Sequence, residues 1–263
     1  MTDILAVEHK GKRLNIEIQR HCFGRPENPV LVFLHEGLGA IASWKDIPKK
    51  LSMSTACNAF VYSRLGYGGS DPVALPRKIN YLHVEALALL PVILKAAQVH
   101  RYIIIGHSDG GSIGIIHAGS GKAKGLEALV TLAAHLFCEP VTLAGLRVAR
   151  ERYTTQDLKQ KLMRIHGKNT ETAFWGWNDT WLSPGFAHWD IQRYLAPIQI
   201  PVMALQGAQD PYSTKAQIDV METGIPDCTS QLIGNCGHIP HLEQEQEVLQ
   251  AITGFVRGIL TGQ

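Results

Sequence analysis

Short runs of apolar residues recur along the whole chain, and each is followed within three residues by glycine, histidine or serine. Continuous apolar runs of this length are typical of parallel strands, because helices cover both faces of such a sheet. Segments with helical spacing fill the intervals between them. This alternation predicts an α/β fold with a doubly wound, mostly parallel sheet, and it places ligands at the carboxyl ends of the strands. The predicted strands are residues 30–34, 58–62, 102–105, 128–132, 202–205 and 229–233.

Local patterns give the expected positions of the helices. Ser43 is followed three residues later by Asp46, a variant of the capping box, so a helix is expected to begin at Ser43. One helix is expected over residues 81–98, with a kink at Pro91 because proline removes a backbone hydrogen bond. The remaining predicted elements are a hairpin over 4–9 and 13–20 and helices over 110–120, 214–224 and 244–260.

The alternation of strands and helices breaks between about residue 137 and residue 197. The pattern there is helical and polar, and it ends in a segment that holds four of the five tryptophans. We interpret residues 137–197 as a helical cap inserted into a core domain that consists of residues 1–136 and 198–263. Buried tryptophans pack more often than they bind ligands, but a cap over a site commonly does both. The candidate substrate contacts in the cap are Trp175, Trp177 and Trp181.

Composition argues against several classes of function. The formal net charge is +2 with no run of five or six like charges, so neither nucleic acid nor an anionic membrane is expected as a partner.

The chain starts without a secretory pattern and has no stretch of roughly 18 apolar residues, so a cytoplasmic protein is expected. Five widely spaced cysteines without a C-x-x-C pair are expected to be buried structural thiols. The sequence carries no signal for the oligomeric state.

The segment Gly106-His107-Ser108-Asp109-Gly110 matches the pattern G-x-S-x-G between a predicted strand and a predicted helix. In this setting the serine is exposed on a sharp turn and acts as a nucleophile. The glycines are needed because side chains beside so tight a turn would clash. The alternative is that Ser108 only caps the helix that follows it.

A nucleophilic serine needs a general base and a carboxylate that orients this base. Asp210 follows the predicted strand 202–205, and His238 follows the last predicted strand. The order serine, aspartate, histidine is the one that accompanies a nucleophile turn of this kind. Taken alone, Asp210 is equally compatible with a solvated aspartate before proline, and His238 with a core or helix-capping histidine.

Together these motifs resemble those of the α/β-hydrolase superfamily, over residues 13–260. The resemblance rests on GHSDGGS, the GAQDP turn, the NCGH loop and the segment YSRLGYGGSD. In that last segment Tyr62 stands where the superfamily has an aspartate, and Leu65 is an extra residue. The resemblance implies a triad that acts through an acyl-enzyme, and its members are Ser108 as nucleophile, His238 as base and Asp210 as orienting acid.

An acyl-transfer site also needs hydrogen-bond donors for the oxyanion. The resemblance implies one donor at the backbone N–H of Asp109 and a second in the loop HEGLG. The second is placed at Gly37, with its neighbours Glu36 and Leu38 as alternatives. Glu36 stands where glycine is usual, and we expect its carboxylate to form an internal ion pair with Arg64, since buried charges are usually paired. Glu36 and Leu38 are also candidate substrate contacts.

The carboxylate of Asp109 has two possible roles. The run GHSDGG is similar to that of biphenyl-hydrolase-like amino-acid-ester hydrolases, which implies that an aspartate meets a substrate ammonium. If that aspartate is Asp109, amine-bearing substrates are favoured. The alternative is that the carboxylate caps the helix or pairs with a base such as Arg64.

The expected activity is the hydrolysis of small carboxylic esters, with lactones, thioesters or activated amides as variants. Carbon–carbon bond hydrolases resemble this chain but typically have tryptophan after the catalytic histidine, where Ile239 stands here, so they are the alternative. A non-catalytic small-molecule receptor with this fold is a further alternative, although no triad member is missing. No cofactor or metal is expected, because His238 and His241 alone supply too few ligands. The expected partner is a small ester-like substrate.

Overall fold

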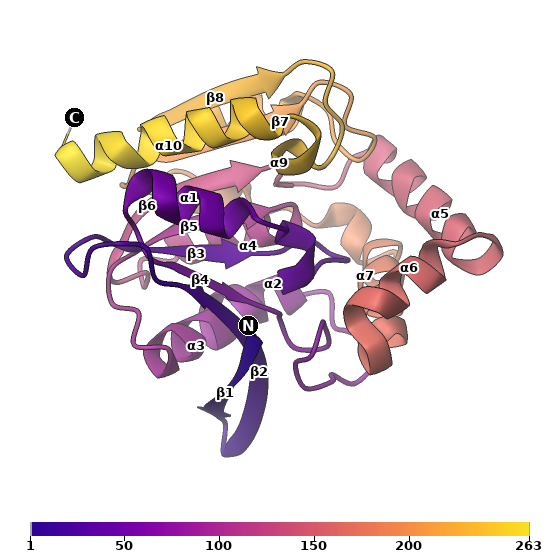
Figure 1. Cartoon of the computed structure of the whole chain (residues 1–263). Helices are drawn as coiled ribbons and strands as arrows, with labels where there is room; N and C mark the ends of the chain where they lie inside the picture. Colours follow the sequence, from indigo (N-terminus) through magenta and orange to yellow (C-terminus); the bar gives the residue numbers. More distant parts are fainter. Residues whose placement is uncertain (1, 263) are drawn as a thin grey trace.

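The computed structural model describes residues 2–262, and within them eight strands form a single sheet (Figure 1). Their order is β1-β2-β4-β3-β5-β6-β7-β8. The pairs β1·β2 and β2·β4 are antiparallel, and the other neighbouring pairs are parallel, which confirms the predicted fold class. The strands are β1 (Thr2–His9), β2 (Lys12–His21), β3 (Val30–Leu34), β4 (Ala59–Tyr62), β5 (Tyr102–His107), β6 (Leu126–Leu132), β7 (Val202–Gly207) and β8 (Cys228–Ile233).

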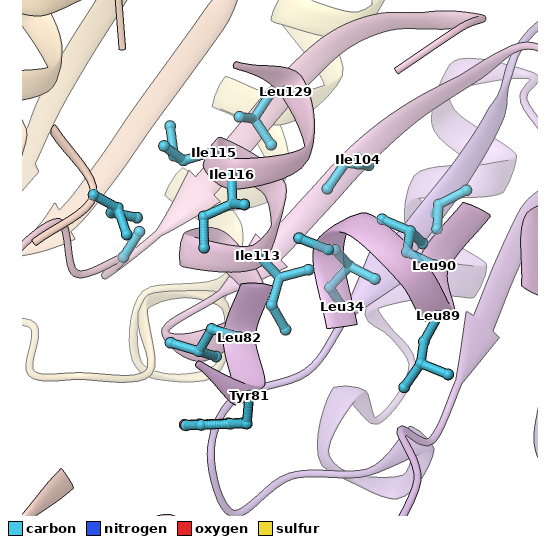
Figure 2. Packing of buried hydrophobic residues seen from close by; sticks show 14 of the residues in the cluster. Leu34, Tyr81, Leu82, Leu89, Leu90, Ile104, Ile113, Ile115, Ile116 and Leu129 are labelled. Carbon is cyan, nitrogen blue, oxygen red and sulfur yellow. The ribbon is translucent and has the colours of Figure 1, made fainter. Parts of the chain in front are cut away.

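Two helical layers cover the sheet (Figure 1). One cluster of buried side chains joins the sheet to α1 (Ile47–Thr55) and α10 (Glu245–Thr261), and a second joins it to the helices of the opposite face. Successive residues of β5 alternate between the two clusters, and all its residues are buried, as the apolar run predicts. Figure 2 shows Ile104 of β5 near Ile113 in the second cluster. The helices of this face are α2 (Tyr81–Val84), α3 (Leu90–Ala96), α4 (Asp109–Ala118) and α8 (Ala216–Gly224).

Two details of the predicted helices are wrong. Ser43 does not begin a helix of its own, because it lies inside a short 3-10 turn at Ile41–Trp44, and α1 follows with Asp46 at its N-cap position. The single helix expected over 81–98 is interrupted by a π-helical segment, η2 (Glu85–Leu89). The wider π turn precedes Pro91, whose ring would clash with the carbonyl four residues earlier in a regular α-helix. The last predicted helix, over 244–260, is confirmed as α10, and the short helix α9 (Pro240–Glu243) precedes it.

A helical segment between β6 and β7 lies beyond the carboxyl ends of the strands (Figure 1). Its helices are α5 (Pro140–Thr155), α6 (Leu158–His166) and α7 (Thr170–Trp181), with short 3-10 turns at Gly167–Asn169, Phe186–His188 and Gln192–Tyr194. The rings of Tyr153 and Phe174 stack 3.7 Å apart and join α5 to α7. We call this segment the cap; its boundaries at residues 137 and 197 stay a prediction. Among the described helices, none has both the length and the apolar composition that a membrane crossing requires.

Candidate active site

The G-x-S-x-G segment forms a sharp turn between β5 and α4. Ser108 has φ 51° and ψ −116°, a strained conformation for a side-chain-bearing residue, and its N–H donates to the carbonyl of Leu132 at 2.8 Å. A Cβ atom at Gly110 would lie 1.9 Å from the carbonyl oxygen of Leu34, so only glycine fits there. This close packing maintains the strained conformation of Ser108, which directs the residue toward the carboxyl end of the sheet.

The sheet brings Asp210 and His238 together from the loops after β7 and β8. His238 Nδ1 lies 2.8 Å from Asp210 Oδ2, while Asp210 also accepts bonds from the N–H of Tyr212 (2.8 Å) and the hydroxyl of Ser213 (3.0 Å). Burial alone would raise the pKa of the Asp210 carboxyl, but the hydrogen bond and charge of His238 lower it overall. The charged carboxylate therefore holds the proton of His238 on Nδ1, which leaves Nε2 free as a base.

Ser108 and His238 line the same cavity, which has a volume of about 550 Å³. No hydrogen bond joins their side chains among the described residues, and hydrogen bonds of this type commonly tighten only when substrate binds. The two expected oxyanion donors are free in the same part of the chain: neither the amide of Gly37 nor that of Asp109 has a hydrogen-bond partner there. Trp177 of α7 lies directly on Gly37, since a Cβ atom at that position would come within 2.3 Å of its ring.

The expected ion pair between Glu36 and Arg64 is wrong. Arg64 donates to the backbone carbonyl of Glu36 at 2.8 Å, whereas the Glu36 carboxylate lies 3.4 Å from Nδ1 of His107. Burial would raise the pKa of the Glu36 carboxyl, but its close contact with His107 and the charges of His107 and His35 lower it overall. The other nitrogen of His107 donates to the carbonyl of His238 at 2.7 Å. Glu36 therefore contacts the loop that carries His238 through His107.

The carboxylate of Asp109 is 1% exposed and lies outside the cavity lining. It accepts a hydrogen bond from the hydroxyl of Tyr81 at 2.6 Å and another from Arg64 at 3.4 Å. The idea that Asp109 meets a substrate ammonium is thus wrong, and the alternative, an ion pair with Arg64, matches the structure.

Of the three tryptophans expected at the substrate, one is misplaced. Trp177 lines the main cavity, and Trp181 lines a small adjoining chamber that also includes Ser108. Trp175 lines neither, and its ring nitrogen donates to Glu171 on the outer side of the cap. Glu36 and Leu38 line the main cavity as expected, with His107, Arg152, Gln209, Pro211, Tyr212, Gly237, Ile239 and Glu243.

A family model described as "Alpha/beta hydrolase family" matches residues 31–251, most of the chain. The chain belongs to this family of hydrolases. Its curated relatives include 3-oxoadipate enol-lactonase 2 of Acinetobacter baylyi, 23% identical over 254 residues that cover 89% of this chain and 91% of the relative. A second enol-lactonase of that organism, 3-oxoadipate enol-lactonase 1, is 30% identical over 70 residues, which cover 27% of this chain and 26% of that relative.

Solved structures of the same fold cover nearly the whole of this hydrolase. A carboxylesterase of Nitrososphaera gargenis has a TM-score of 0.79 at 17% identity, with 98% of this chain and 100% of that chain covered. Proline iminopeptidase of Mycobacterium smegmatis has a TM-score of 0.75 at 18% identity, with 99% and 100% covered. Identities this low establish the fold and nothing finer.

Several residues of this hydrolase's site carried no signal in the sequence. The ring of Tyr212 lies 4.7 Å from that of His238, and the ring of His135 lies 5.8 Å from it, in the small chamber. Tyr212 belongs to the turn of Asp210 and could have been found from that neighbourhood, whereas Arg152 comes from the cap, whose packing the sequence does not reveal. Among the described residues no cluster of three or more histidine, cysteine or acidic side chains could hold a metal ion.

Proposed function

We propose that this hydrolase cleaves small carboxylic esters or lactones through a covalent acyl-enzyme on Ser108. The observation that carries the proposal is the 2.8 Å bond that joins Asp210 to His238 across two loops, with His238 lining the same cavity as the strained Ser108. Aspartate and histidine in this arrangement turn a serine hydroxyl into a nucleophile.

The reaction proceeds in two halves. His238 Nε2 takes the proton of Ser108 Oγ as this oxygen attacks the substrate carbonyl carbon, and the N–H groups of Gly37 and Asp109 stabilise the oxyanion. The intermediate collapses when the bond to the leaving oxygen breaks and His238 returns the proton to that oxygen. Water then attacks the acyl carbon by the same route, which releases the acid and restores Ser108.

Labelling by a fluorophosphonate probe tests the nucleophile. The wild type is expected to react at Ser108, and Ser108→Ala to lose the adduct entirely. Ser112→Ala is the matched control, because this serine of α4 is buried and its hydroxyl donates to the carbonyl of His135. Mass spectrometry of the intact protein and its peptides locates the adduct. A folded wild type that does not react, or that reacts elsewhere, contradicts the proposal.

An arginine in the cavity, unpaired among the described residues, offers a binding site for an anionic group of the substrate. Arg152 is the one lysine or arginine in its lining, and no carboxylate pairs with it among the described residues. The two carboxylates of the lining already have partners within the protein. Glu36 lies against His107, and Glu243 accepts hydrogen bonds from the amides of Gly237 and Ile239 at 2.7 and 2.8 Å. Relatives named for an enol-lactone of a dicarboxylate are consistent with this preference.

Substitution of Arg152 by glutamine is expected to lower kcat/KM about 10-fold for the 4-nitrophenyl monoester of glutarate, because a charged hydrogen bond to the free carboxylate is lost. Hydrolysis of 4-nitrophenyl pentanoate, which has the same acyl length without the charge, is expected to change less than twofold. Arg147→Gln removes a charge of α5 outside the cavity and should affect neither ester. Equal losses for both esters would contradict the anionic preference.

A further inference from the structure

Arg64 is a buried cation, and the contacts of its side chain are too few to explain its burial as a contribution to stability. Its side chain is fully buried behind the two oxyanion donors, after the end of β4. Within the described residues its Nε and Nη1 atoms have no hydrogen-bond partner, although the guanidinium lies 4.7 Å from the ring of Tyr67. Buried donors without partners are costly, and where a protein retains them a functional reason is common.

The first contact of Arg64 fixes a single peptide group. Its Nη2 donates to the carbonyl of Glu36 at 2.8 Å, and His35 Nδ1 donates to the same oxygen at 2.7 Å. The carbonyl of Glu36 and the N–H of Gly37 belong to one planar trans peptide, so they point in opposite directions. Two donors on the oxygen therefore set the direction of the free Gly37 N–H, and they also polarise it.

His35 is held in one protonation state by the same arrangement. Its Nε2 accepts the backbone N–H of Arg64 at 3.0 Å, so the ring is neutral, with its proton on Nδ1. Burial and, to a lesser degree, the charge of Arg64 hold the pKa of His35 well below its usual value. The Nδ1–H group of His35 therefore donates to the Glu36 carbonyl throughout the neutral pH range.

The second contact of Arg64 reaches the other oxyanion donor. Nη2 also lies 3.4 Å from the carboxylate of Asp109, whose own N–H is the first amide of α4. Tyr81 donates to that carboxylate at 2.6 Å, and Trp181 of the cap donates to the Tyr81 hydroxyl at 2.8 Å. One guanidinium nitrogen therefore joins the two backbone segments that carry the donors, and a buried hydrogen-bond chain connects them to the cap.

We propose that Arg64 is a positioning residue that orients both oxyanion donors of this hydrolase, with Tyr81 supporting the donor at Asp109. The proposal rests on the acyl-enzyme mechanism proposed above. Because the donors bind the oxyanion more strongly than the ground-state carbonyl, loss of their alignment lowers kcat and leaves KM nearly unchanged.

The main variant is Arg64→Met combined with Asp109→Asn, which removes the guanidinium without leaving a buried carboxylate unpaired. Expected results are a 10- to 100-fold lower kcat for 4-nitrophenyl butyrate, a KM within threefold of the wild type, and a matching loss of affinity for a trifluoromethyl ketone, whose adduct with Ser108 carries an oxyanion. Circular dichroism and thermal unfolding establish that the variant is folded. A folded variant that keeps kcat and ketone affinity within threefold overturns the proposal.

A second pair of variants decides the matter if the double variant does not fold. Tyr81→Phe removes the hydroxyl that holds Asp109, and Tyr102→Phe removes a similarly buried hydroxyl that bonds His117 at 2.7 Å, outside the cavity lining. We expect kcat and ketone affinity to fall about 3- to 10-fold for Tyr81→Phe alone. Equal effects of the two variants overturn the proposal. A wild type without esterase activity or probe labelling would instead refute the acyl-enzyme mechanism itself.

Discussion

Replacement of Asp210 by asparagine is expected to lower kcat by about four orders of magnitude, with little change in KM. The hydrogen bonds around Asp210 explain the size of this effect. Oδ1 accepts from the N–H of Tyr212, so the amide oxygen of the asparagine would take that place and its NH₂ group would replace Oδ2. This NH₂ would donate to Nδ1 of His238, which lies 2.8 Å from Oδ2 in the wild type, and move the ring proton to Nε2. A protonated Nε2 cannot accept the proton of Ser108.

Steady-state kinetics on a neutral 4-nitrophenyl ester measure this loss. Ser213→Ala is the matched control, because it removes one donor to Asp210 while the carboxylate and the tautomer of His238 stay as they are. We expect less than a 10-fold change in kcat for this control. Proton NMR of His238 should report the changed tautomer in Asp210→Asn. An Asp210→Asn variant with near wild-type kcat would remove His238 and Asp210 from the mechanism.

The free energy of unfolding is expected to fall steeply as the pH drops below about 6.5. Burial lowers the pKa of His135 to about 4 and that of His241 to about 3, and both side chains are almost fully buried. Between pH 6 and pH 4.5 the unfolded chain binds a proton at each site and the folded chain does not, so acid favours unfolding. Two such groups cost together about 3 kcal/mol per pH unit, a large share of an ordinary domain's stability.

Other buried histidines add to this dependence in the same direction. Burial also lowers the pKa of His35, His117 and His166. The carboxyls of Glu36 and Asp210, whose pKa values are lowered in the folded state, extend the loss of stability to more acidic pH, where they become protonated.

Urea unfolding at several values between pH 7 and pH 4.5 measures the slope. His241→Phe keeps a ring of similar shape beside Trp44 and removes one titrating group, so its slope should be about 1.4 kcal/mol per pH unit smaller than that of the wild type. His188→Gln changes an exposed histidine and should leave the slope as it is. A stability independent of pH in this range would mean that these histidines are protonated in the folded chain.

The central strands β3 to β7 were predictable from the sequence because they are buried on both faces, so that continuous apolar runs such as Ile103, Ile104 and Ile105 indicate them directly. Ser108, Asp210 and His238 were found from their order and from the glycines around the serine. The pairing of Arg64 with Asp109 was among the predicted alternatives, but its contact with Glu36 was not predicted, because the backbone carbonyl of Glu36 and not the carboxylate accepts from Arg64. The pattern of side chains in a sequence does not indicate which backbone carbonyl of a loop will accept a hydrogen bond.

The error over Trp175 has a simpler cause. At about 100° per residue, Trp177 and Trp181 lie on the same face of α7, whereas Trp175 is rotated by about 200° from Trp177. Helical phase could have separated them, once the bounds of α7 were known. Which cap residues line the cavity, as Arg152 does, depends on how the helices pack over the sheet, and the periodicity of the sequence does not encode this packing.

The way the cap is attached limits how this enzyme can be remodelled by exchange of segments. Trp177 rests on Gly37, Trp181 bonds to Tyr81, and His166 joins the amide of Gly68 to the carbonyl of Leu38. A cap transplanted from a relative would have to bring matching residues for all of these points in the core. The cap and the loop that carries Gly37 would therefore have to be exchanged together, and substitutions within the cap are a simpler way to change the substrate range than replacement of the whole cap.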